Sequence, residues 1–463
     1  MVAPKPVELL SLWGFVLCCG GVFFLLDAFY VPGEGTLSNI LSILWSLPVF
    51  DAIVALWGNL QTKQEISRLR KLRHTPPLHL GHLLIVVPTI GRYDTLPSLK
   101  RAVRSFCEHL PPLFPSLGID IVIEERSEAR SEIVAFAAML PDTRVIVVPH
   151  AYHTVKGTRF KARALHYAQQ MRGEGNHDNA SSWILHMDDD TSVGPDTAES
   201  IAQFIHEQQE SPNPKLLAQG ILTFPFEYSL GVIPWVADAV RPPDDAGHFG
   251  VVNRSGYPTN GMHGELMLIN AAVEAELGWD LGPHSIGEDS VMALKFCTRF
   301  PGRSGWFLGR SYGASPASIR DFIRQRRRWS AGLFELTREP AIHWYYRVWI
   351  SRRPFMSCLT TAIHILVLLR FALVGPVNIF PSSRLILMFW SVTVLSKPWA
   401  YLQGLRLNMD ASAHPLKITW FEYLQFAAST PLAMVLEMFS AYLGILDGFR
   451  GRPESFDVIP KLR

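Results

Sequence analysis

Cysteine is scarce in this chain, and its few cysteines have no spacing that suits a zinc ion. Five occur in 463 residues, and two of them lie inside one apolar run. Reduced thiols in a cytosolic setting fit this usage best. The five are Cys18, Cys19, Cys107, Cys297 and Cys358.

The sequence also lacks a glycine-rich phosphate loop of the P-loop or dinucleotide type. This absence argues against kinases, NTPases and dehydrogenases, which commonly hold phosphates with such loops. Charge of one sign is lacking as well, because the formal net charge is only +2. The chain therefore has no overall bias toward nucleic acid, and its partners must be inferred from local features.

Two long apolar runs lie near the N-terminus. Leu9–Leu26 has no charged residue over about 18 positions, near the minimum for a helix that spans a bilayer, although a cleaved signal peptide is an alternative. Ile40–Leu60 is also apolar but contains Pro48 and Asp51. Basic residues follow it between positions 63 and 73, so the positive-inside rule places the next segment in the cytosol. We predict two transmembrane helices within residues 1–62 and a cytosolic domain over residues 63–345.

Further apolar segments follow in the C-terminal third, at Phe355–Ile379, Leu385–Leu405 and Trp420–Leu446. Each is interrupted by an ionisable residue and a proline. Ionisable groups at membrane depth usually face protein or water, so they could line a passage or an acceptor cleft. An interfacial or re-entrant segment is the alternative. We predict a membrane region of two to four helices and a short tail over residues 346–463, and thus an integral, multi-pass protein whose domain over residues 63–345 faces the cytosol.

Strand and helix patterns alternate in the predicted cytosolic domain. Leu83–Val87 is a continuous apolar run, and the next apolar residues, from Leu96 to Phe106, recur at helical spacing. Similar strands are expected at Ile119–Ile123, Arg144–Val148 and Trp183–Met187, with helices between them. This order predicts an α/β fold with a mostly parallel sheet and helices on both faces. The strand ends would bring Thr89, Arg92, Glu125 and a run of aspartates to one edge.

Three consecutive carboxylates, Asp188, Asp189 and Asp190, follow the apolar strand that begins at Trp183. Open α/β sheets bind ligands at this edge, and adjacent carboxylates suit a hard divalent cation. Mg²⁺ or Mn²⁺ held by Asp188 and Asp190 would also contact a diphosphate. A solvated acidic turn or a helix N-cap is the alternative.

Two later motifs could complete a site for sugar transfer. Glu288 and Asp289 begin an apolar helix, where acidic residues also complement the helix dipole, and one of them could serve as a general base toward a sugar hydroxyl. Four arginines lie within positions 324–328, directly before Trp329. They could form an ordinary basic face beside a membrane. They also suit a leaving diphosphate, and the indole of Trp329 could stack on a sugar ring.

A glycine-rich segment, Tyr257–Glu265, lies between the two acidic motifs. Its glycines could simply form turns. Because of its place in the chain, we name Gly261, His263, Gly264 and Glu265 as candidates for binding the acceptor.

The order of these motifs resembles the family 2 inverting glycosyltransferases, which have a GT-A fold and include relatives of cellulose and hyaluronan synthases. The resemblance is closer to the egghead-type β-1,4-mannosyltransferases and covers most of residues 83–335. The stretches that carry it are Lys161–Leu165, Trp183–Thr191, Gln219–Thr223, Gly287–Asp289 and Ser315–Gly332.

The resemblance implies a role for each matching residue. Asp289 would be the catalytic base with Glu288 beside it, Asp188 and Asp190 would hold the metal, and Trp329 would contact the acceptor. Glu125 would lie where the family usually has an aspartate that contacts the nucleoside. The donor would be bound by Thr89, Arg92, Glu125, Lys161, Arg163, Asp188, Asp189, Gln325 and Arg328.

Together these features predict a membrane-bound, metal-dependent, inverting glycosyltransferase. By resemblance, it would move mannose from GDP-mannose to a hydroxyl of a glycan or glycolipid and form a β-1,4 linkage. A processive β-glycan synthase using UDP-glucose or a related UDP-sugar is the alternative enzyme. A membrane scaffold or transporter that merely binds a nucleotide is the alternative without catalysis. The expected partners are a nucleotide sugar, a glycan or glycolipid acceptor and the lipid bilayer, with no nucleic acid.

Overall fold

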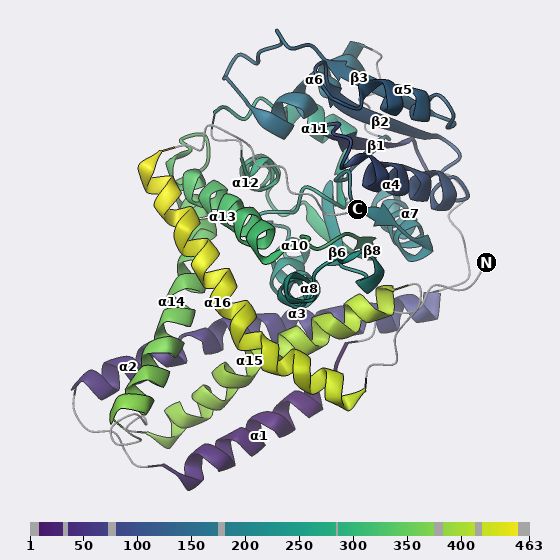
Figure 1. Ribbon diagram of the computed structural model, residues 1–463. Coiled ribbons are helices and arrows are strands. Elements are labelled where there is room, and N and C mark those ends of the chain that lie inside the picture. Colours follow the sequence, from purple (N-terminus) through teal and green to yellow (C-terminus); the bar gives the residue numbers. More distant parts are fainter. Residues whose placement is uncertain are drawn as a thin grey trace.

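A mixed sheet of eight strands forms the centre of the fold in the computed structural model, which describes residues 9–30, 36–72, 80–174, 181–283, 286–374, 383–412 and 419–451 (Figure 1). The strand order is β3-β2-β1-β4-β7-β6-β8-β5. The strands are β1 (Leu83–Pro88), β2 (Leu117–Glu124), β3 (Thr143–Val148), β4 (Trp183–His186), β5 (Ser192–Val193), β6 (Leu217–Thr223), β7 (Met267–Asn270) and β8 (Ser304–Tyr312).

The first half of the sheet has the predicted parallel pattern, and the second half does not. Strands β3, β2, β1 and β4 are all parallel, and each coincides with one of the expected strands. Beyond β4 the sheet becomes mixed, because β7 runs antiparallel to both β4 and β6 while β8 is parallel to β6 and antiparallel to β5. The α/β class is therefore confirmed, with a sheet that is more mixed than expected.

Helices cover both faces of the sheet, as the continuous apolar strands require. Successive side chains of a strand point to opposite faces, so Leu83, Ile85 and Val87 join one core and Leu84 and Val86 the other. The first core also contains residues of α4 (Leu96–His109), α5 (Arg130–Ala137) and α7 (Pro195–Glu210). The second contains residues of α6 (Phe160–Glu174) and α12 (Glu288–Arg299).

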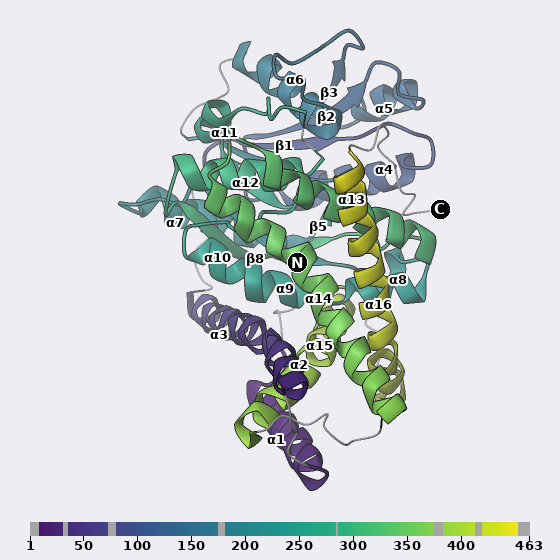
Figure 2. The ribbon, with the colours of Figure 1, turned by 90° about the vertical axis from the view of Figure 1, so that its left-hand side faces the viewer.

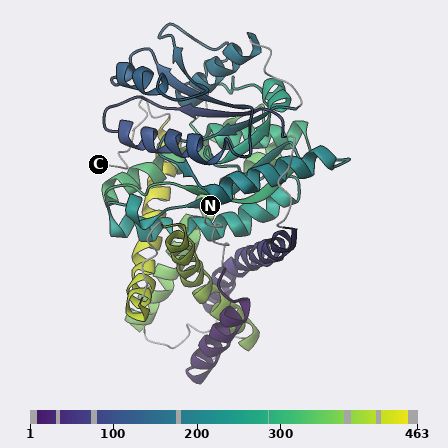
Figure 3. The same cartoon turned by 90° about the vertical axis from the view of Figure 1, so that its right-hand side faces the viewer.

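Long helices from both ends of the chain extend away from the sheet. Figures 2 and 3 show α1, α2, α14 and α15 on the side of the molecule opposite β2 and β3, while α16 lies along α13. The long helices are α1 (Leu12–Ala28), α2 (Thr36–Ser46), α3 (Pro48–Leu72), α13 (Ile319–Glu335), α14 (Trp344–Val374), α15 (Arg384–Ala411) and α16 (Trp420–Arg450). Shorter elements are η1 (Phe226–Tyr228), α8 (Val232–Asp238), α9 (Arg241–Asp244), the π-helix η2 (Asp245–Phe249), α10 (Gly250–Arg254), α11 (Ala271–Leu277) and η3 (Leu336–Arg338).

Two helices in the described ranges are long and apolar enough to cross a membrane, namely α15 and the Leu424–Arg450 part of α16. Both overlap segments that the sequence nominated, Leu385–Leu405 and Trp420–Leu446, and extend beyond them. The helix α1 is apolar but has only 17 residues. The third C-terminal candidate, Phe355–Ile379, begins within α14, and its residues 375–379 lie outside the described residues. The division of the chain into membrane and cytosolic parts stays a prediction.

The apolar run Ile40–Leu60 is divided between two helices, and the prediction that it crosses a membrane stays a prediction. The helix α2 ends at Ser46 and α3 begins at Pro48. Proline is accepted in the first turn of a helix but disrupts its interior, which accounts for the break.

The second helix, α3, instead lies against the sheet domain. The Thr62 hydroxyl donates to the carbonyl of Ala246 at 3.0 Å. At Gly58, a Cβ atom would stand 2.2 Å from the carbonyl oxygen of Gly247 in η2, so glycine permits this close approach. Gly404 plays the same part for α15, where a Cβ would stand 1.4 Å from the carbonyl oxygen of Ala239. Both helices are therefore docked on the segment that contains α8, α9 and η2.

Candidate active site

A cavity of about 1060 Å³ opens where the strands β1 and β4 end. It extends from the aspartates after β4, past the start of α12 and the middle of α13, to side chains of α3, α15 and α16. Most of the candidate site residues line it, namely Thr89, Lys161, Arg163, Asp188, Asp189, His263, Gly264, Glu265, Glu288, Asp289, Gln325, Arg328 and Trp329, together with Asp190. The structure thus brings three separate motifs together around one cavity, along with the glycine-rich segment Tyr257–Glu265, which we call the acceptor segment after its predicted role.

A cluster of three carboxylates forms one wall of this cavity. Asp188, Asp190 and Glu265 each offer an oxygen, and these oxygens lie within 4.8 Å of one another. The sheet explains the meeting, because His186 pairs with Met267 in the antiparallel β4–β7 ladder. The chain two residues after His186 therefore lies beside the chain two residues before Met267. Three carboxylate oxygens that leave room for water and phosphate suit Mg²⁺ or Mn²⁺, so the residues fit such an ion.

The middle aspartate, Asp189, points to a different partner. The hydroxyl of Thr89, at the end of β1, donates to Asp189 Oδ2 at 2.5 Å. The Thr191 hydroxyl meanwhile donates to Glu265, and the Arg101 guanidinium donates to the backbone carbonyl of Asp190 at 2.8 Å. These bonds fix the loop after β4, so that its first and third aspartates face Glu265.

Lys161, at the start of α6, connects this cluster with the second acidic motif. Its ammonium donates to Asp188 and lies 3.3 Å from Glu288 Oε1. Burial opposes the charge of this lysine, but the carboxylates of Asp188 and Glu288 outweigh burial and keep its pKa above the usual range. Gly264 makes room for it, since a Cβ there would stand 2.5 Å from Lys161 Nζ. The two acidic motifs therefore face one another across a single cation.

The acidic pair at the start of α12 has perturbed acidities. Burial raises the pKa of Glu288, and the nearby ammonium of Lys161 opposes this rise. Burial also raises the pKa of Asp289, and the neighbouring charge of Glu288 adds to the rise, which brings the pKa to about 7. Asp289 accepts a hydrogen bond from the backbone N–H of Ser290 at 2.6 Å. A carboxylate with a pKa near neutrality has the properties of a general base.

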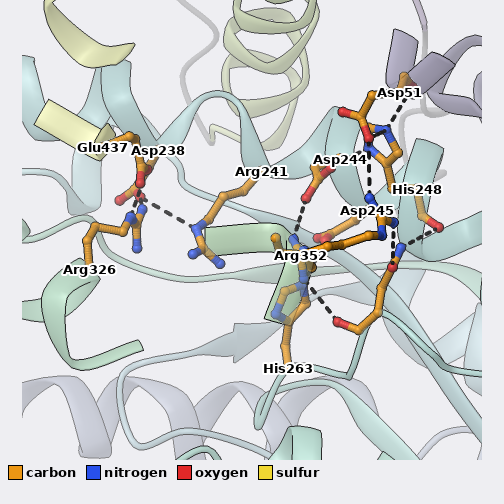
Figure 4. A network of polar contacts seen from close by, with 12 residues as sticks. Asp51, Asp238, Arg241, Asp244, Asp245, His248, His263, Arg326, Arg352 and Glu437 are labelled. Carbon is orange, nitrogen blue, oxygen red and sulfur yellow. Dashed lines mark hydrogen bonds and ion pairs between the residues drawn. The ribbon is translucent and has the colours of Figure 1, made fainter. Parts of the chain in front are cut away.

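Some residues of the arginine-rich motif on α13 line the cavity, and others form ion pairs with neighbouring helices. Gln325, Arg328 and Trp329 line the cavity, whereas Arg327 pairs with Asp447 at the surface. Arg326 is buried and binds Asp238 and Glu437, the latter at 2.8 Å (Figure 4). No motif in the sequence marks Asp238, which comes from α8. Glu437, from α16, is the ionisable residue that interrupts the apolar segment Trp420–Leu446, and it lines the cavity.

The indole of Trp329 differs from the open stacking surface that we expected. The guanidinium carbon of Arg241 lies 3.9 Å from its ring centroid, and that of Arg326 lies 4.1 Å away. Two cations thus already pack against the ring. Nothing in the sequence pointed to Arg241, because it lies far from the arginine-rich motif along the chain.

Within the acceptor segment, His263 and Glu265 are held by residues of β6 and η2. His263 Nε2 lies 2.7 Å from Asp245 Oδ1, and its backbone N–H donates to Gln219 Oε1 at 2.9 Å. The Gln219 side-chain amide in turn donates to the carbonyl of Glu265 at 3.1 Å. Gln219 belongs to one of the stretches that carried the family resemblance, and here it positions the segment.

Three candidate residues do not line the cavity: Arg92, Glu125 and Gly261. Arg92 pairs with Asp94 at 2.7 Å, and Glu125 accepts from the backbone N–H of His150 at 2.8 Å. Glu124 lines the cavity in place of its neighbour and accepts from Arg163 at 2.7 Å. Glu124 is the last residue of β2, and the donor contact expected of Glu125 stays a prediction.

Comparison with known proteins adds independent findings. Residues 183–402 match the family model described as glycosyl transferase family group 2. Beta-1,4-mannosyltransferase egh of Drosophila melanogaster is 29% identical over 193 residues, which cover 41% of this chain and 40% of that protein. Beta-1,4-mannosyltransferase bre-3 of Caenorhabditis elegans is 28% identical over 201 residues, which cover 42% of this chain and 41% of that protein. The match thus spans about two fifths of the length of these curated relatives.

Among solved structures, the chain is similar to the mannosyltransferase PcManGT from Pyrobaculum calidifontis, which was solved in complex with GDP-Man and Mn²⁺. The identity is 15%, the TM-score is 0.44, and the match covers 89% of this chain and 99% of that chain. Because this TM-score is low, the similarity to glycosyltransferases rests on the family model and the sequence relatives, not on this structure.

Proposed function

We propose that this chain, which carries a family 2 glycosyltransferase domain and resembles the egghead-type β-1,4-mannosyltransferases, transfers mannose from GDP-mannose to a hydroxyl of a glycan or glycolipid. Glycosyl transfer follows from the family. The mannose donor and the β-1,4 linkage are proposed from the relatives' names. The observation that carries the proposal is the position of Lys161, which contacts both Asp188 of the carboxylate cluster and Glu288 of the second acidic motif.

The carboxylate cluster is the proposed metal site. Asp188, Asp190 and Glu265 would hold Mg²⁺ or Mn²⁺, and such an ion would offset the negative charge of the donor's diphosphate. Glu265 joins this set in place of the acceptor role that the sequence suggested. Arg328, which lines the same cavity, is proposed to bind the diphosphate as it leaves.

Asp289 is the proposed base of an inverting displacement. The acceptor oxygen forms a new bond to the anomeric carbon, the bond from that carbon to the diphosphate oxygen breaks, and the hydroxyl proton passes to Asp289. The two oxygens lie on opposite sides of the carbon, so an α-linked donor gives a β-linked product. The raised pKa of Asp289 supports this role, because a base that works near pH 7 transfers protons most effectively when its pKa is close to that pH.

The membrane location is likewise a proposal. It is supported by the lengths and apolar character of α15 and the Leu424–Arg450 part of α16. Both helices contribute side chains to the cavity, among them Trp399 and Met434. A cavity that continues from carboxylates to apolar helix surfaces suits an acceptor with an apolar portion. We propose a multi-pass protein whose sheet domain faces the cytosol.

The same extension of the cavity also favours a second candidate, a processive β-glycan synthase that uses a UDP-sugar and passes its product between the helices. The two candidates differ in product length. Mass spectrometry of the product separates them, because a single added hexose supports the mannosyltransferase and a ladder of additions supports the synthase.

The test of the proposal is donor turnover by the purified full chain in lipid nanodiscs. The chain is incubated with GDP-mannose, UDP-glucose and other nucleotide sugars, in Mn²⁺, in Mg²⁺ and in excess EDTA, and the released nucleoside diphosphate is measured. We expect release from GDP-mannose only with a divalent cation and acceptor, and a β-anomeric product by NMR. Equal turnover in EDTA would refute the metal site, and an α-anomeric product would refute the single displacement.

A further inference from the structure

Arg241 lies inside the cavity but belongs to none of the motifs that define the family. It begins α9, in the segment between β6 and the acceptor segment, and its side chain is 19% exposed. Figure 4 shows it between the Arg326 cluster and the group that contains Asp245 and His263. Its guanidinium packs over the indole of Trp329, with 3.9 Å from Cζ to the ring centroid, so the plane of the guanidinium is held in place.

The hydrogen bonding of Arg241 is incomplete. In the part of the chain that the structure describes, its guanidinium donates no hydrogen bond, and Nε is shielded from solvent without a hydrogen-bond partner. Its nearest carboxylate is Asp238, at 3.8 Å from Nε, which is an ion-pair distance longer than a hydrogen bond. A guanidinium has five N–H donors, and buried groups of this kind are normally bonded. The unused donors therefore call for an acceptor that enters the cavity.

The charge near Arg241 is also weakly compensated. Asp238 and Glu437 both bind Arg326, which lies on the other side of Asp238 (Figure 4). Burial lowers the pKa of Arg241 to about 10, with the neighbouring charge of Arg326 as the next contribution, and the carboxylates of Asp238, Glu437 and Asp245 only partly offset this. For Arg326 the carboxylates of Glu437 and Asp238 outweigh burial, and its pKa is raised. Arg241 is thus a cation at neutral pH whose counter-ions are engaged elsewhere.

We propose that Arg241 binds a phosphoryl oxyanion of a ligand in this cavity, a binding role that rests on the proposed function. A planar guanidinium with free N–H groups suits two oxygens of a phosphate, and stacking on Trp329 fixes the orientation in which it offers them. Two sources of the phosphate share this chemistry. One is the diphosphate of the nucleotide sugar, and the other is a phosphate that joins the acceptor sugar to its lipid.

Two substitutions test the role, Arg241→Gln and Arg241→Lys. Arg299→Gln is the matched control, because Arg299 is 67% exposed, pairs with Glu276 and does not line the cavity. Binding of GDP and of pyrophosphate, each with Mn²⁺, is measured by calorimetry on the full chain in detergent. The KM is then measured for a polyprenyl-phosphate-linked sugar and for a neutral alkyl glycoside that bears the same sugar.

The two sources give different results. If Arg241 binds the donor's diphosphate, Arg241→Gln weakens GDP and pyrophosphate about 10- to 100-fold, in line with the loss of charge-assisted hydrogen bonds. If it binds the acceptor's phosphate, GDP binding is unchanged and the KM rises about as much for the phosphate-linked sugar alone. Arg241→Lys is expected to lie between wild type and Arg241→Gln, since it keeps the charge without the planar fork. Values for Arg241→Gln within twofold of wild type for all four ligands would overturn the proposal.

Folding and function are separated by further readouts. The thermal midpoint of each variant reports a structural effect. If Arg241→Gln does not fold, Arg241→Lys decides, and wild-type affinities in that variant overturn the proposal. Pyrophosphate binding requires no sugar transfer. Weakened pyrophosphate binding in a protein whose wild type transfers no sugar would therefore support this role for Arg241 while refuting the proposed function.

Discussion

Replacing Asp289 by asparagine is the sharpest test of the proposed base. The amide has the shape of the carboxylate, and its oxygen can still accept the backbone N–H of Ser290. It cannot take a proton from an acceptor hydroxyl. Loss of a general base commonly lowers the rate by about 10²- to 10⁴-fold, or roughly 2.7–5.5 kcal/mol of barrier at 1.36 kcal/mol per tenfold change. We expect this loss in kcat, with binding of GDP and Mn²⁺ changed by less than about threefold.

The pH dependence provides an independent check on the same residue. Because the pKa of Asp289 is raised to about 7, wild-type kcat/KM should increase as the pH rises through 7 and Asp289 loses its proton. The asparagine variant should lack this rise. Stability should change in the opposite direction, since a raised carboxyl pKa means that the folded state loses stability between the ordinary pKa of 3.8 and about 7.

The size of that stability change has an upper limit. A shift from 3.8 to about 7 corresponds to at most about 4 kcal/mol at pH 8, so Asp289→Asn should melt at a higher temperature than wild type in differential scanning fluorimetry. An inactive but more stable protein is the expected combination. Wild-type turnover in the asparagine variant, or a flat wild-type pH profile between 6 and 8, would refute the assignment of the base.

Three other substitutions test the surrounding structure. Lys161→Met removes the cation that lies beside Glu288 and lowers the pKa of Asp289. The rising limb of the pH–rate profile should therefore move to higher pH. An unmoved limb would contradict the electrostatic coupling. Glu265→Gln should raise the Mn²⁺ concentration for half-maximal activity at least about tenfold. The control Glu276→Gln should not, because Glu276 pairs with Arg299 and does not line the cavity; equal effects of the two changes would argue against the metal site. Gly404→Ala should destabilise the fold by at least about 1–3 kcal/mol and lower the thermal midpoint, because the added Cβ meets the backbone of Ala239. The control Gly20→Ala should not, since Gly20 has open space around it. Equal thermal midpoints of the two variants would contradict the docking of α15.

The sequence predicted the part of the site that depends on local pattern. Apolar runs such as Leu83–Val87 indicate buried strands, and the carboxyl ends of parallel strands meet at one edge, so the position of Asp188 could be anticipated. The start of α12 at Glu288 was predictable for a similar reason, because acidic residues followed by an apolar helical pattern mark a helix N-terminus.

The parts that were missed depend on long-range pairing. Glu265 reaches the carboxylate cluster only because β7 runs antiparallel to β4, and neither the direction nor the register of that pairing can be read from Met267–Asn270 alone. Arg241 and Asp238 lie in short helices without a motif, and their proximity to Trp329 arises from tertiary packing. The break between α2 and α3 did have a local signal, Pro48, which a count of apolar residues did not use.

One electrostatic feature underlies both halves of the proposed reaction. Carboxylates crowd one wall of the cavity: Lys161 contacts those of Asp188 and Glu288, Asp190 and Glu265 join Asp188 in the carboxylate cluster, and Asp289 follows Glu288. Two like charges 4 Å apart repel by about 4 kcal/mol at an effective dielectric constant of 20, so a diphosphate could not approach this wall unaided. A divalent cation on the cluster would reverse the sign of the charge where the diphosphate binds. At the other end, the same crowding of negative charge and the same burial raise the pKa of Asp289. The same crowding of carboxylates therefore supports both the proposed metal site and the proposed base, Asp289.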